Sequence, residues 1–180
     1  KGLPNTNHVV RVNDLGAGTH GRDVAVLGAA VLGPSETKWD QPPEPGPDPA
    51  NVYYGWNEYS VFNEQNVNQI AADDWLCTTQ EPVSDIHWWG SFIGWNRGDP
   101  PPMQPTAFHI AIWTDVPAGQ VPWSHPGTCI WENYCTSYNM QFVGWDYDPR
   151  TRSIEACYKF EQFLPADQWF YQEGEDNVYW

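Results

Sequence analysis

The sequence predicts an all-β protein: an antiparallel two-sheet β-sandwich of jelly-roll type, with an extended arm at its N-terminus. Two observations support this fold class. Turn-forming residues are dense, with 17 Pro and 15 Gly among 180 residues, and the apolar segments between them are short, as is typical of strands. In addition, no segment shows a convincing helical period. We therefore expect two packed sheets rather than a helical or mixed fold.

Each predicted strand is a short apolar segment bounded by turn residues. The clearest boundary is residues 41–50 (QPPEPGPDPA), because Pro has no N–H to donate to a central strand pairing. Other breaks of this kind occur at residues 33–35, 99–105, 122–127 and 146–150. The predicted strands are residues 8–12, 23–32, 52–62, 74–78, 84–95, 107–114, 129–132, 140–145, 153–163, 169–172 and 178–180. A helical turn or two is expected at residues 65–72.

The alternation of side chains indicates how the later strands are buried. Residues 153–163 alternate apolar and polar side chains, the pattern of a strand with one face on the core and one in water. Residues 84–95 and 107–114 are apolar on both faces. Such strands are either covered on the second face or present an aromatic surface that binds something.

The first 37 residues differ in composition, and we assign them to an N-terminal arm or strand segment, with the sandwich domain over residues 38–180. Within the arm, residues 24–32 (VAVLGAAVL) include no aromatic side chain. One hypothesis is that this segment pairs with a neighbouring subunit by strand addition. The other is that it is an ordinary edge or core strand of the same domain. The residues that would make the assembly contact are Val24, Val26, Leu27, Val31 and Leu32.

The net charge limits the partners that the chain can bind. Acidic residues outnumber basic ones 23 to 8, which gives a formal net charge of −15 and a pI near 4.3. This charge argues against nucleic acid and against anionic membrane surfaces. The longest apolar stretch, residues 24–32, is too short to span a membrane, so we expect no membrane insertion. Because the chain begins at Lys1 rather than Met, we interpret it as a processed product or a fragment of an extracellular protein.

The four cysteines are Cys77, Cys129, Cys135 and Cys157. An even number in a Trp-rich, Lys-poor chain suits an oxidising compartment, so disulfides are expected. Four cysteines allow three pairings, of which we favour Cys129–Cys135, around a short loop, together with Cys77–Cys157. The alternative is four buried free thiols, because Cys also packs as a small hydrophobic residue.

The sequence lacks the nucleophile elbow, the phosphate-binding loop and the His-Glu-x-x-His metalloprotease motif. We therefore expect a protein that is not an enzyme and requires no cofactor. A glycosidase-like carboxylate pair can be imagined among 23 acids. However, Asp73 and Asp74 are adjacent at a strand start, where their side chains would point apart, so we interpret them as turn and strand-entry residues.

Two acidic segments have the spacing of calcium ligands, and hard oxygen ligands suit Ca²⁺ in an acidic extracellular protein. The candidate ligands are Asp146, Asp148, Glu173, Glu175 and Asp176. Neither segment matches the EF-hand loop pattern. The alternative is that these acids belong to solvated loops and bind no ion.

The high content of Trp, 12 residues, is the most informative feature of the composition for function, because Trp and Tyr stack on sugar faces and anchor protein interfaces. The candidate ligand-binding residues are Trp89, Trp95, Trp113, His87 and His109, and the two histidines would lie side by side if their strands pair. The alternative is that most Trp residues pack the core and its rims, and that the histidines are packed and hydrogen-bonded.

From residue 38 onward, a series of motifs extends over about 140 residues in a fixed order. They are Lys38-Trp39-x-Gln41-Pro42-Pro43, Ala72-Asp73-Asp74-Trp75-Leu76-Cys77, residues 83–94 (VSDIHWWGSFIG), Phe108-x-Ile110-x-Ile112-x-x-Asp115-Val116-Pro117-Ala118, Pro126-Gly127, Trp131, Gly144-Trp145-x-Tyr147-Asp148-Pro149, Phe170-Tyr171-Gln172-Glu173-Gly174 and Val178-Tyr179-Trp180. In order and spacing they resemble a family of uncharacterised secreted bacterial domains, numerous in planctomycete-like genomes. The resemblance implies a β-sandwich module on an exported protein, often tethered at its C-terminus, and implies no particular chemistry. Residues 1–37 lie outside the resemblance, and relatives continue a few residues past Trp180 to complete a strand, so we expect a truncated end.

The leading hypothesis is a non-enzymatic structural or assembly module of a bacterial surface layer, fibre or appendage, which polymerises with copies of itself through the N-terminal strand. The alternative is a carbohydrate-binding module that holds an extracellular glycan with exposed Trp and Tyr side chains. A glycan-active enzyme is a third and less favoured hypothesis.

Overall fold

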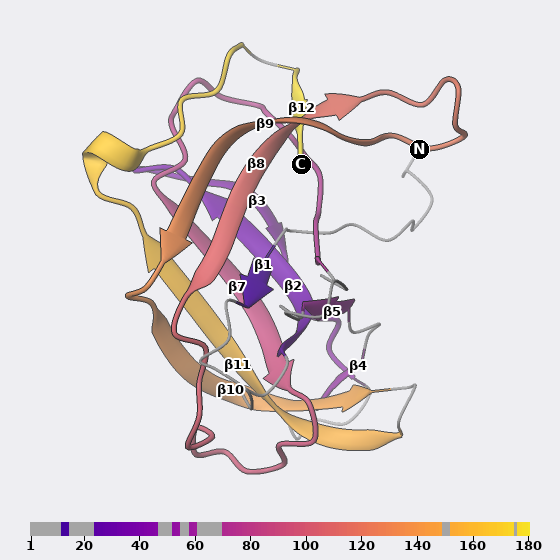
Figure 1. Ribbon diagram of the computed structural model, residues 1–180, viewed down its shortest axis with the longest axis vertical. Coiled ribbons are helices and arrows are strands. Elements are labelled where there is room, and N and C mark those ends of the chain that lie inside the picture. The colour runs from indigo at the N-terminus through magenta and orange to yellow at the C-terminus, as the bar shows by residue number, and fades with distance from the viewer. Residues whose placement is uncertain are drawn as a thin grey trace.

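The computed structural model describes residues 12–14, 24–46, 52–54, 58–60, 70–148, 152–174 and 176–180 (Figure 1). Within these ranges the regular structure is almost entirely strand, and the predicted all-β sandwich is confirmed. The elements are β1 (Val12–Asp14), β2 (Val24–Leu32), β3 (Thr37–Gln41), β4 (Val52–Tyr54), β5 (Glu58–Ser60), β6 (Trp75–Leu76), β7 (Asp85–Phe92), β8 (Phe108–Val116), β9 (His125–Cys135), β10 (Asn139–Asp148), β11 (Ser153–Phe163), the short 3₁₀ helix η1 (Ala166–Gln168) and β12 (Val178–Tyr179).

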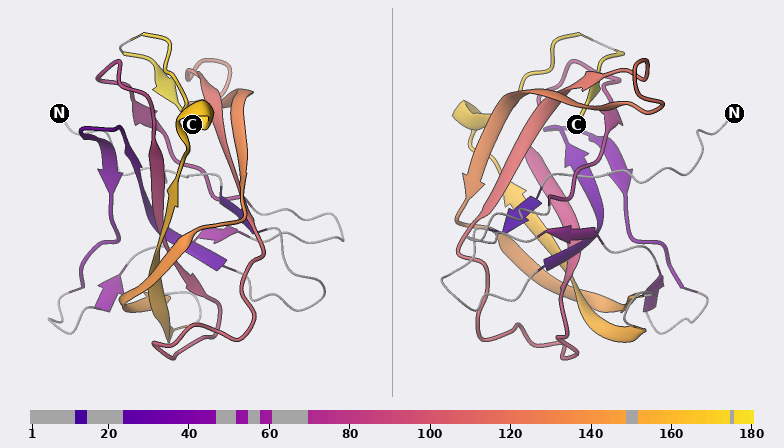
Figure 2. Two further views of the ribbon diagram at one scale, coloured as in Figure 1. Left: turned by 90° about the vertical axis from the view of Figure 1, so that its left-hand side faces the viewer. Right: turned by 45° about the vertical axis from the view of Figure 1, so that its right-hand side comes forward.

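The described strands form two sheets that pack face to face. The five-stranded sheet has the order β1-β8-β12-β6, with β9 on the other side of β8. The seven-stranded sheet has the order β3-β2-β7-β11-β10-β4, with β5 also paired to β2. Figure 2 shows the two layers side by side in its left-hand view.

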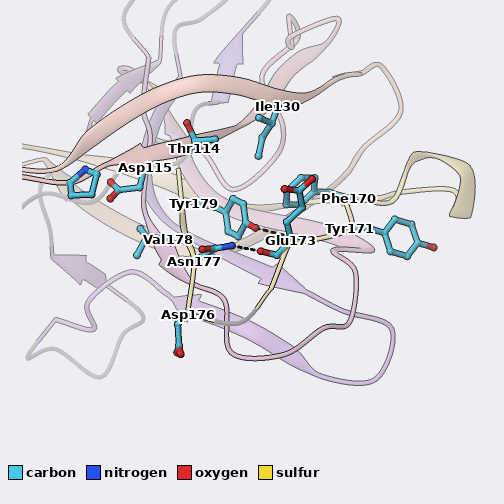
Figure 3. Close-up of a pocket in the computed structure, with 11 residues that line it drawn as sticks. Thr114, Asp115, Ile130, Phe170, Tyr171, Glu173, Asp176, Asn177, Val178 and Tyr179 are labelled. Atoms are coloured by element: carbon cyan, nitrogen blue, oxygen red, sulfur yellow. Dashed lines mark hydrogen bonds between the residues drawn. The ribbon is translucent and has the colours of Figure 1, made fainter.

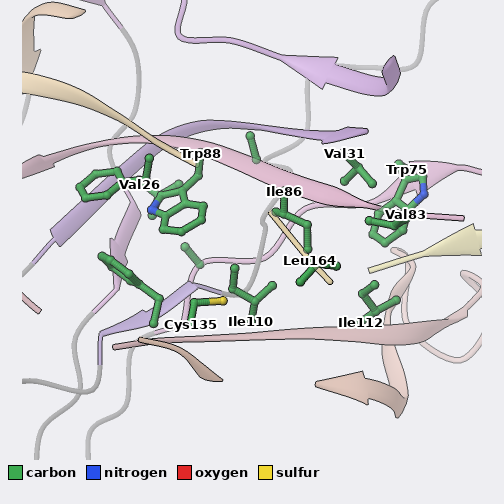
Figure 4. Packing of buried hydrophobic residues seen from close by; sticks show 14 of the residues in the cluster. Val26, Val31, Trp75, Val83, Ile86, Trp88, Ile110, Ile112, Cys135 and Leu164 are labelled. Atoms are coloured by element: carbon green, nitrogen blue, oxygen red, sulfur yellow. The ribbon is translucent and has the colours of Figure 1, made fainter. Parts of the chain in front are cut away.

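The core lies between the two sheets and is largely aromatic. Trp88 of β7 is fully buried, stacks on Phe160 of the neighbouring β11 with ring centroids 5.3 Å apart, and meets Phe108 of the opposite sheet edge-on at 5.0 Å. Ile110 and Ile112 of β8 face the same layer (Figure 4). Because every second residue of β7, β8 and β11 points inward, the alternation read from the sequence accounts for this core.

The predicted N-terminal arm is wrong for Val24–Leu32, because β2 is an interior strand. It pairs with β7 along its length, from Val24 opposite Phe92 to Leu32 opposite Asp85. Its other edge is occupied by β5 over one half and by β3 over the other. Of the predicted assembly residues, Val26 and Val31 belong to the core, and Leu27 and Leu32 are half-buried. The continuous run of small aliphatic residues is typical of a strand buried on both faces, and the consecutive residues Ala29, Ala30 and Val31 are all buried.

Several boundaries also differ from prediction. Strand β3 was not predicted, and residues 169–172 form a single bridge between Phe170 and Val83 rather than a strand. Strand β9 extends to His125, although Pro126 and Gly127 read as a break. An edge strand tolerates Pro because the missing N–H faces outward. Of the predicted strand 8–12 only Val12 is described, and residues 65–69 of the predicted helical turn lie outside the described residues, while residues 70–72 are not helical.

The favoured disulfide pairing is also wrong, and all four thiols are free. Cys129 and Cys135 lie six positions apart on β9, which separates them by about 20 Å, far beyond the reach of a disulfide. Cys77 belongs to the core between the sheets. Cys157 lies opposite Ser91 on the outer face of the seven-stranded sheet, since its neighbours on β11 point into the core.

Candidate functional site

The three predicted ligand-binding tryptophans do not share a surface. Trp89 lies on the outer face of the seven-stranded sheet, where the Lys159 ammonium is 5.8 Å from its ring centroid. Trp113 is on β8 of the other sheet, and its main chain exchanges two hydrogen bonds with Trp180. Trp95 follows β7 in a loop and donates its indole N–H to the Asp99 carbonyl at 2.7 Å. Trp89, Trp95 and Trp113 therefore do not form a common sugar-binding surface in the described fold.

His87 is a packed residue on the outer face of the seven-stranded sheet. Its Nε2 lies 3.5 Å from the Asp85 carboxylate and its Nδ1 lies 3.9 Å from Glu161, which is itself paired with Lys159 at 2.7 Å. Burial, followed by the charge of Lys159, lowers the pKa of His87, and the nearby acids Glu161, Asp85 and Asp40 only partly oppose this shift. His87 is therefore neutral at pH 7, as a packed histidine should be.

His109 lies on β8, in the other sheet, so the two histidines are not side by side. Its ring stacks on Tyr134 with centroids 4.4 Å apart and planes 7° apart, and its Nε2 lies 3.0 Å from the Glu132 carboxylate. Both partners are on the neighbouring strand β9. This cluster is small and flat rather than hollow.

Asp146 and Asp148, predicted as loop residues, belong to strand β10. Both are almost completely buried on the outer face of the seven-stranded sheet, with Glu155 of β11 directly opposite Asp146. Glu155 accepts hydrogen bonds from the Ser91 hydroxyl at 3.0 Å and from the Gly94 N–H at 2.6 Å. Asp146 and Asp148 are therefore buried residues of a strand, and their interpretation as solvated loop acids is wrong.

The candidate site is a cavity of about 680 Å³ at the end of the five-stranded sheet, which we call the C-terminal pocket. It lies between the end of β8, the middle of β9 and the segment that leads into β12 (Figure 3). Its lining residues are Thr114, Asp115, Pro117, Ile130, Phe170, Tyr171, Glu173, Asp176, Asn177, Val178 and Tyr179. A cavity of this volume is in the range of pockets that bind small molecules or sugar units.

Hydrogen bonds hold the wall formed by the C-terminal segment. The Glu173 N–H donates to the Tyr179 hydroxyl at 2.9 Å, and the Asn177 side-chain amide donates to the Glu173 carbonyl. On the opposite wall, Asp115 accepts the indole N–H of Trp180 at 2.7 Å. The backbone at Glu173 is thus fixed at two points, while Tyr171 at the rim is 63% exposed.

Two of the predicted calcium ligands, Glu173 and Asp176, line the C-terminal pocket, and Glu175 lies outside the described residues. Figure 3 shows Asp176 pointing away from Glu173 rather than toward it. Across the described ranges, no three His, Cys, Asp or Glu side chains are grouped closely enough to hold a metal ion. Calcium binding therefore stays a prediction from the sequence.

Sequence reasoning found only Glu173 and Asp176 among the lining residues and missed the rest, including Thr114, Asp115 and Tyr171. Its walls come from residues 114–117, from Ile130 and from residues 170–179, which are far apart in the chain, so no local spacing reveals the pocket. One signal was available: Asp115-Val116-Pro117 and the closing Phe170–Gly174 segment are both among the motifs that support the resemblance.

Comparison with known proteins assigns the chain to a family. The model of one family, described as "Domain of unknown function (DUF7901)", matches residues 37–180. The chain belongs to the DUF7901 family. No curated protein and no solved structure matches the chain.

The DUF7901 match includes the C-terminal pocket but begins at Thr37, after β2. Strand β2 thus lies outside the matched region, although its residues Ala29 and Val31 are buried in the core. Among the described residues of this DUF7901 chain, no helix has the length and hydrophobicity of a membrane span.

Proposed function

We propose that this DUF7901 domain is a non-enzymatic β-sandwich module on the outside of a bacterial cell, and that it binds a glycan in the C-terminal pocket. The observation that supports the proposal is the pocket itself, a cavity of about 680 Å³ in which exposed aromatic and aliphatic side chains adjoin carboxylates, an amide and a hydroxyl. The family resemblance supports an exported bacterial protein.

The lining has the two features that sugar recognition needs. Tyr171 and Ile130 are 63% and 44% exposed and present apolar surface on which a sugar ring can pack. Thr114, Asn177 and Glu173 supply donors and acceptors for hydroxyl groups. Because the rim at Tyr171 is exposed to solvent, the pocket suits a segment of a longer chain as well as a single sugar.

The same structure weakens the leading sequence hypothesis. Polymerisation through Val24–Leu32 required a free strand, and β2 is already paired on both edges. The sugar platform built from Trp89, Trp95 and Trp113 loses its support too, because these residues lie apart. The C-terminal pocket takes its place as the site of carbohydrate binding.

The test is a glycan array with the full chain, followed by calorimetric titration of any glycan that binds. Tyr171→Ala should weaken binding about tenfold, because a stacked aromatic ring contributes on the order of 0.5–1.5 kcal/mol beyond the apolar area that it buries. Tyr134→Ala is the matched control, since Tyr134 is 55% exposed but lies outside the pocket. Absence of binding to any glycan, or equal loss in both variants, would contradict the proposal.

Catalysis is tested separately, by incubating the protein with neutral and acidic polysaccharides and measuring reducing ends. We expect none to form. If hydrolysis occurs and is abolished by Glu173→Gln, the domain is a glycan-active enzyme instead.

A second candidate function, self-assembly, is favoured by strand β9. Within the described part of the chain this strand of 11 residues pairs only with β8, and it contains no Lys or Arg to discourage pairing with another strand. Sedimentation of the full chain over a wide concentration range tests this idea. A monomer at every concentration excludes it.

A further inference from the structure

We infer that the C-terminal pocket selects glycans that carry ammonium groups, such as polymers of glucosamine, over acidic glycans. This inference rests on the proposed function and names the class of its ligand. It follows from the charge of the lining, from the lack of a described hydrogen-bond partner for the Glu173 carboxylate, and from the positions of the cationic side chains.

The lining is uniformly acidic. Asp115, Glu173 and Asp176 are the charged residues in it, and no described Lys, Arg or His contributes to the wall. A uronic acid or sulfated sugar placed there would meet like charge with no described cation to pair with it, whereas a protonated amine would be attracted.

Glu173 is the carboxylate best placed to receive the ammonium group. Its main chain is held by Tyr179 and Asn177, but no described side chain is hydrogen-bonded to its carboxylate. Asp115 already accepts the Trp180 indole N–H, and Asp176 points away from the pocket centre in Figure 3. The backbone of Glu173 is fixed, and its exposed carboxylate has no described hydrogen-bond partner, so it is available to accept the ammonium group.

Three of the four described Lys and Arg residues interact away from the pocket, and the fourth, Arg152, is not part of the lining. The ammonium of Lys38 donates to Thr79 and Glu81, Arg97 pairs with Asp99, and Lys159 pairs with Glu161. Each of these three cations is therefore engaged elsewhere. Ile130 and the rim residue Tyr171 add apolar surface to the same lining.

The experiment compares three hexasaccharides by calorimetric titration of the full chain at about pH 6, where carboxylates are ionised and sugar amines are largely protonated. The probes are a β-1,4-linked glucosamine oligomer, its N-acetylated form and an oligogalacturonate. We expect the amine form to bind about tenfold more tightly than the N-acetylated form, and the acidic oligomer to bind weakest. Salt should reduce this preference.

Glu173→Gln should bring the amine and N-acetylated forms within about threefold of each other. Glu36→Gln, which removes the same charge from an exposed turn, should leave the preference intact. An equal loss in both variants would show a diffuse effect of the net charge and overturn the inference.

Failure of the inference and failure of the proposed function give different results. If the N-acetylated or acidic oligomer binds as well as the amine, and Tyr171→Ala abolishes that binding, the inference is wrong while glycan binding in the pocket stands. If no glycan in the array or in this series binds, both are wrong.

Discussion

At the scale of single residues, the aromatic excess is divided between a packed interior and a few exposed rings. Trp88 has no exposed surface, whereas Trp123 is 63% exposed. The composition alone could not separate these roles, because the same residue type fills cores and binds ligands. The position in the fold decides whether a Trp is buried or exposed: Trp88 lies on β7, and Trp123 lies in the loop between β8 and β9.

Replacing Trp88 by Ala should lower the free energy of unfolding by about 3–5 kcal/mol, because its stacked contact with Phe160 and its edge contact with Phe108 across the sheets are both lost. Trp123→Ala is the control and should change stability by less than about 0.5 kcal/mol. Urea unfolding followed by circular dichroism measures both. Equal effects would mean that Trp88 is not central to the core.

His87 should make stability depend on pH. Burial lowers its pKa below the ordinary value of 6.5, so the unfolded chain takes up this proton at a higher pH than the folded one. The free energy of unfolding therefore falls as the pH drops below about 6.5. His87→Gln should lose less stability than the wild type between about pH 7 and pH 5. An unchanged slope in urea titrations across this range would contradict the assignment.

The cysteines should behave as free thiols with very different accessibility. Burial raises the pKa of Cys135 to about 12, and burial together with the charge of Asp146 raises the pKa of Cys157 further. Titration with the thiol reagent DTNB under native conditions should label only the half-buried Cys129 readily. After denaturation without reductant, all four should react. If fewer than four thiols react in the denatured chain, the remaining cysteines form disulfides and the prediction is wrong.

At the scale of elements, the strands with regular alternation could be predicted, and those defined by distant contacts could not. The predicted strand 153–163 matches β11. Strand β3 was missed because Lys38 looks like a surface residue, yet it is buried with its ammonium bonded to Thr79 and Glu81. The two-sided apolar pattern of residues 84–95 indicated a covered strand but not which elements cover it.

Glycine at position 28 should be essential to the junction of β2 and β3. A Cβ there would contact the Gln41 carbonyl oxygen and lie 3.0 Å from the main chain of Pro42 and Pro43, which can move only if the strands separate. Gly28→Ala should therefore destabilise the fold by about 1–3 kcal/mol. Gly119→Ala is the control, because its nearest contact would be 3.9 Å away. Thermal unfolding of both variants tests this prediction.

At the scale of the whole molecule, the structural domain is larger than the matched family region. The sequence predicted a boundary near residue 38 because the composition changes there, and the family match begins at residue 37. Composition does not report strand pairing, however, and β2 pairs with β7 and contributes Val26, Ala29 and Val31 to the core. The C-terminal pocket escaped prediction for the same reason, since its walls meet only in the folded chain.

A chain that begins at Thr37 should therefore fail to fold cooperatively, because one edge of β7 and part of the core would be exposed to water. A chain that begins at Val12 keeps both β1 and β2 and should unfold in a single transition. Circular dichroism melts of the two fragments compare them directly. A native-like melt of the 37–180 fragment would show that β2 is dispensable.

The interior position of β2 also determines when the protein can fold. Its residues are made early, yet their partners on β7 come about 60 positions later, and β7 itself needs β11 on its other edge. Such long sequence separations give a high contact order and slow folding. The β2–β3 and β8–β9 hairpins can pair as they are made, but the seven-stranded sheet is complete only after β11 has been made.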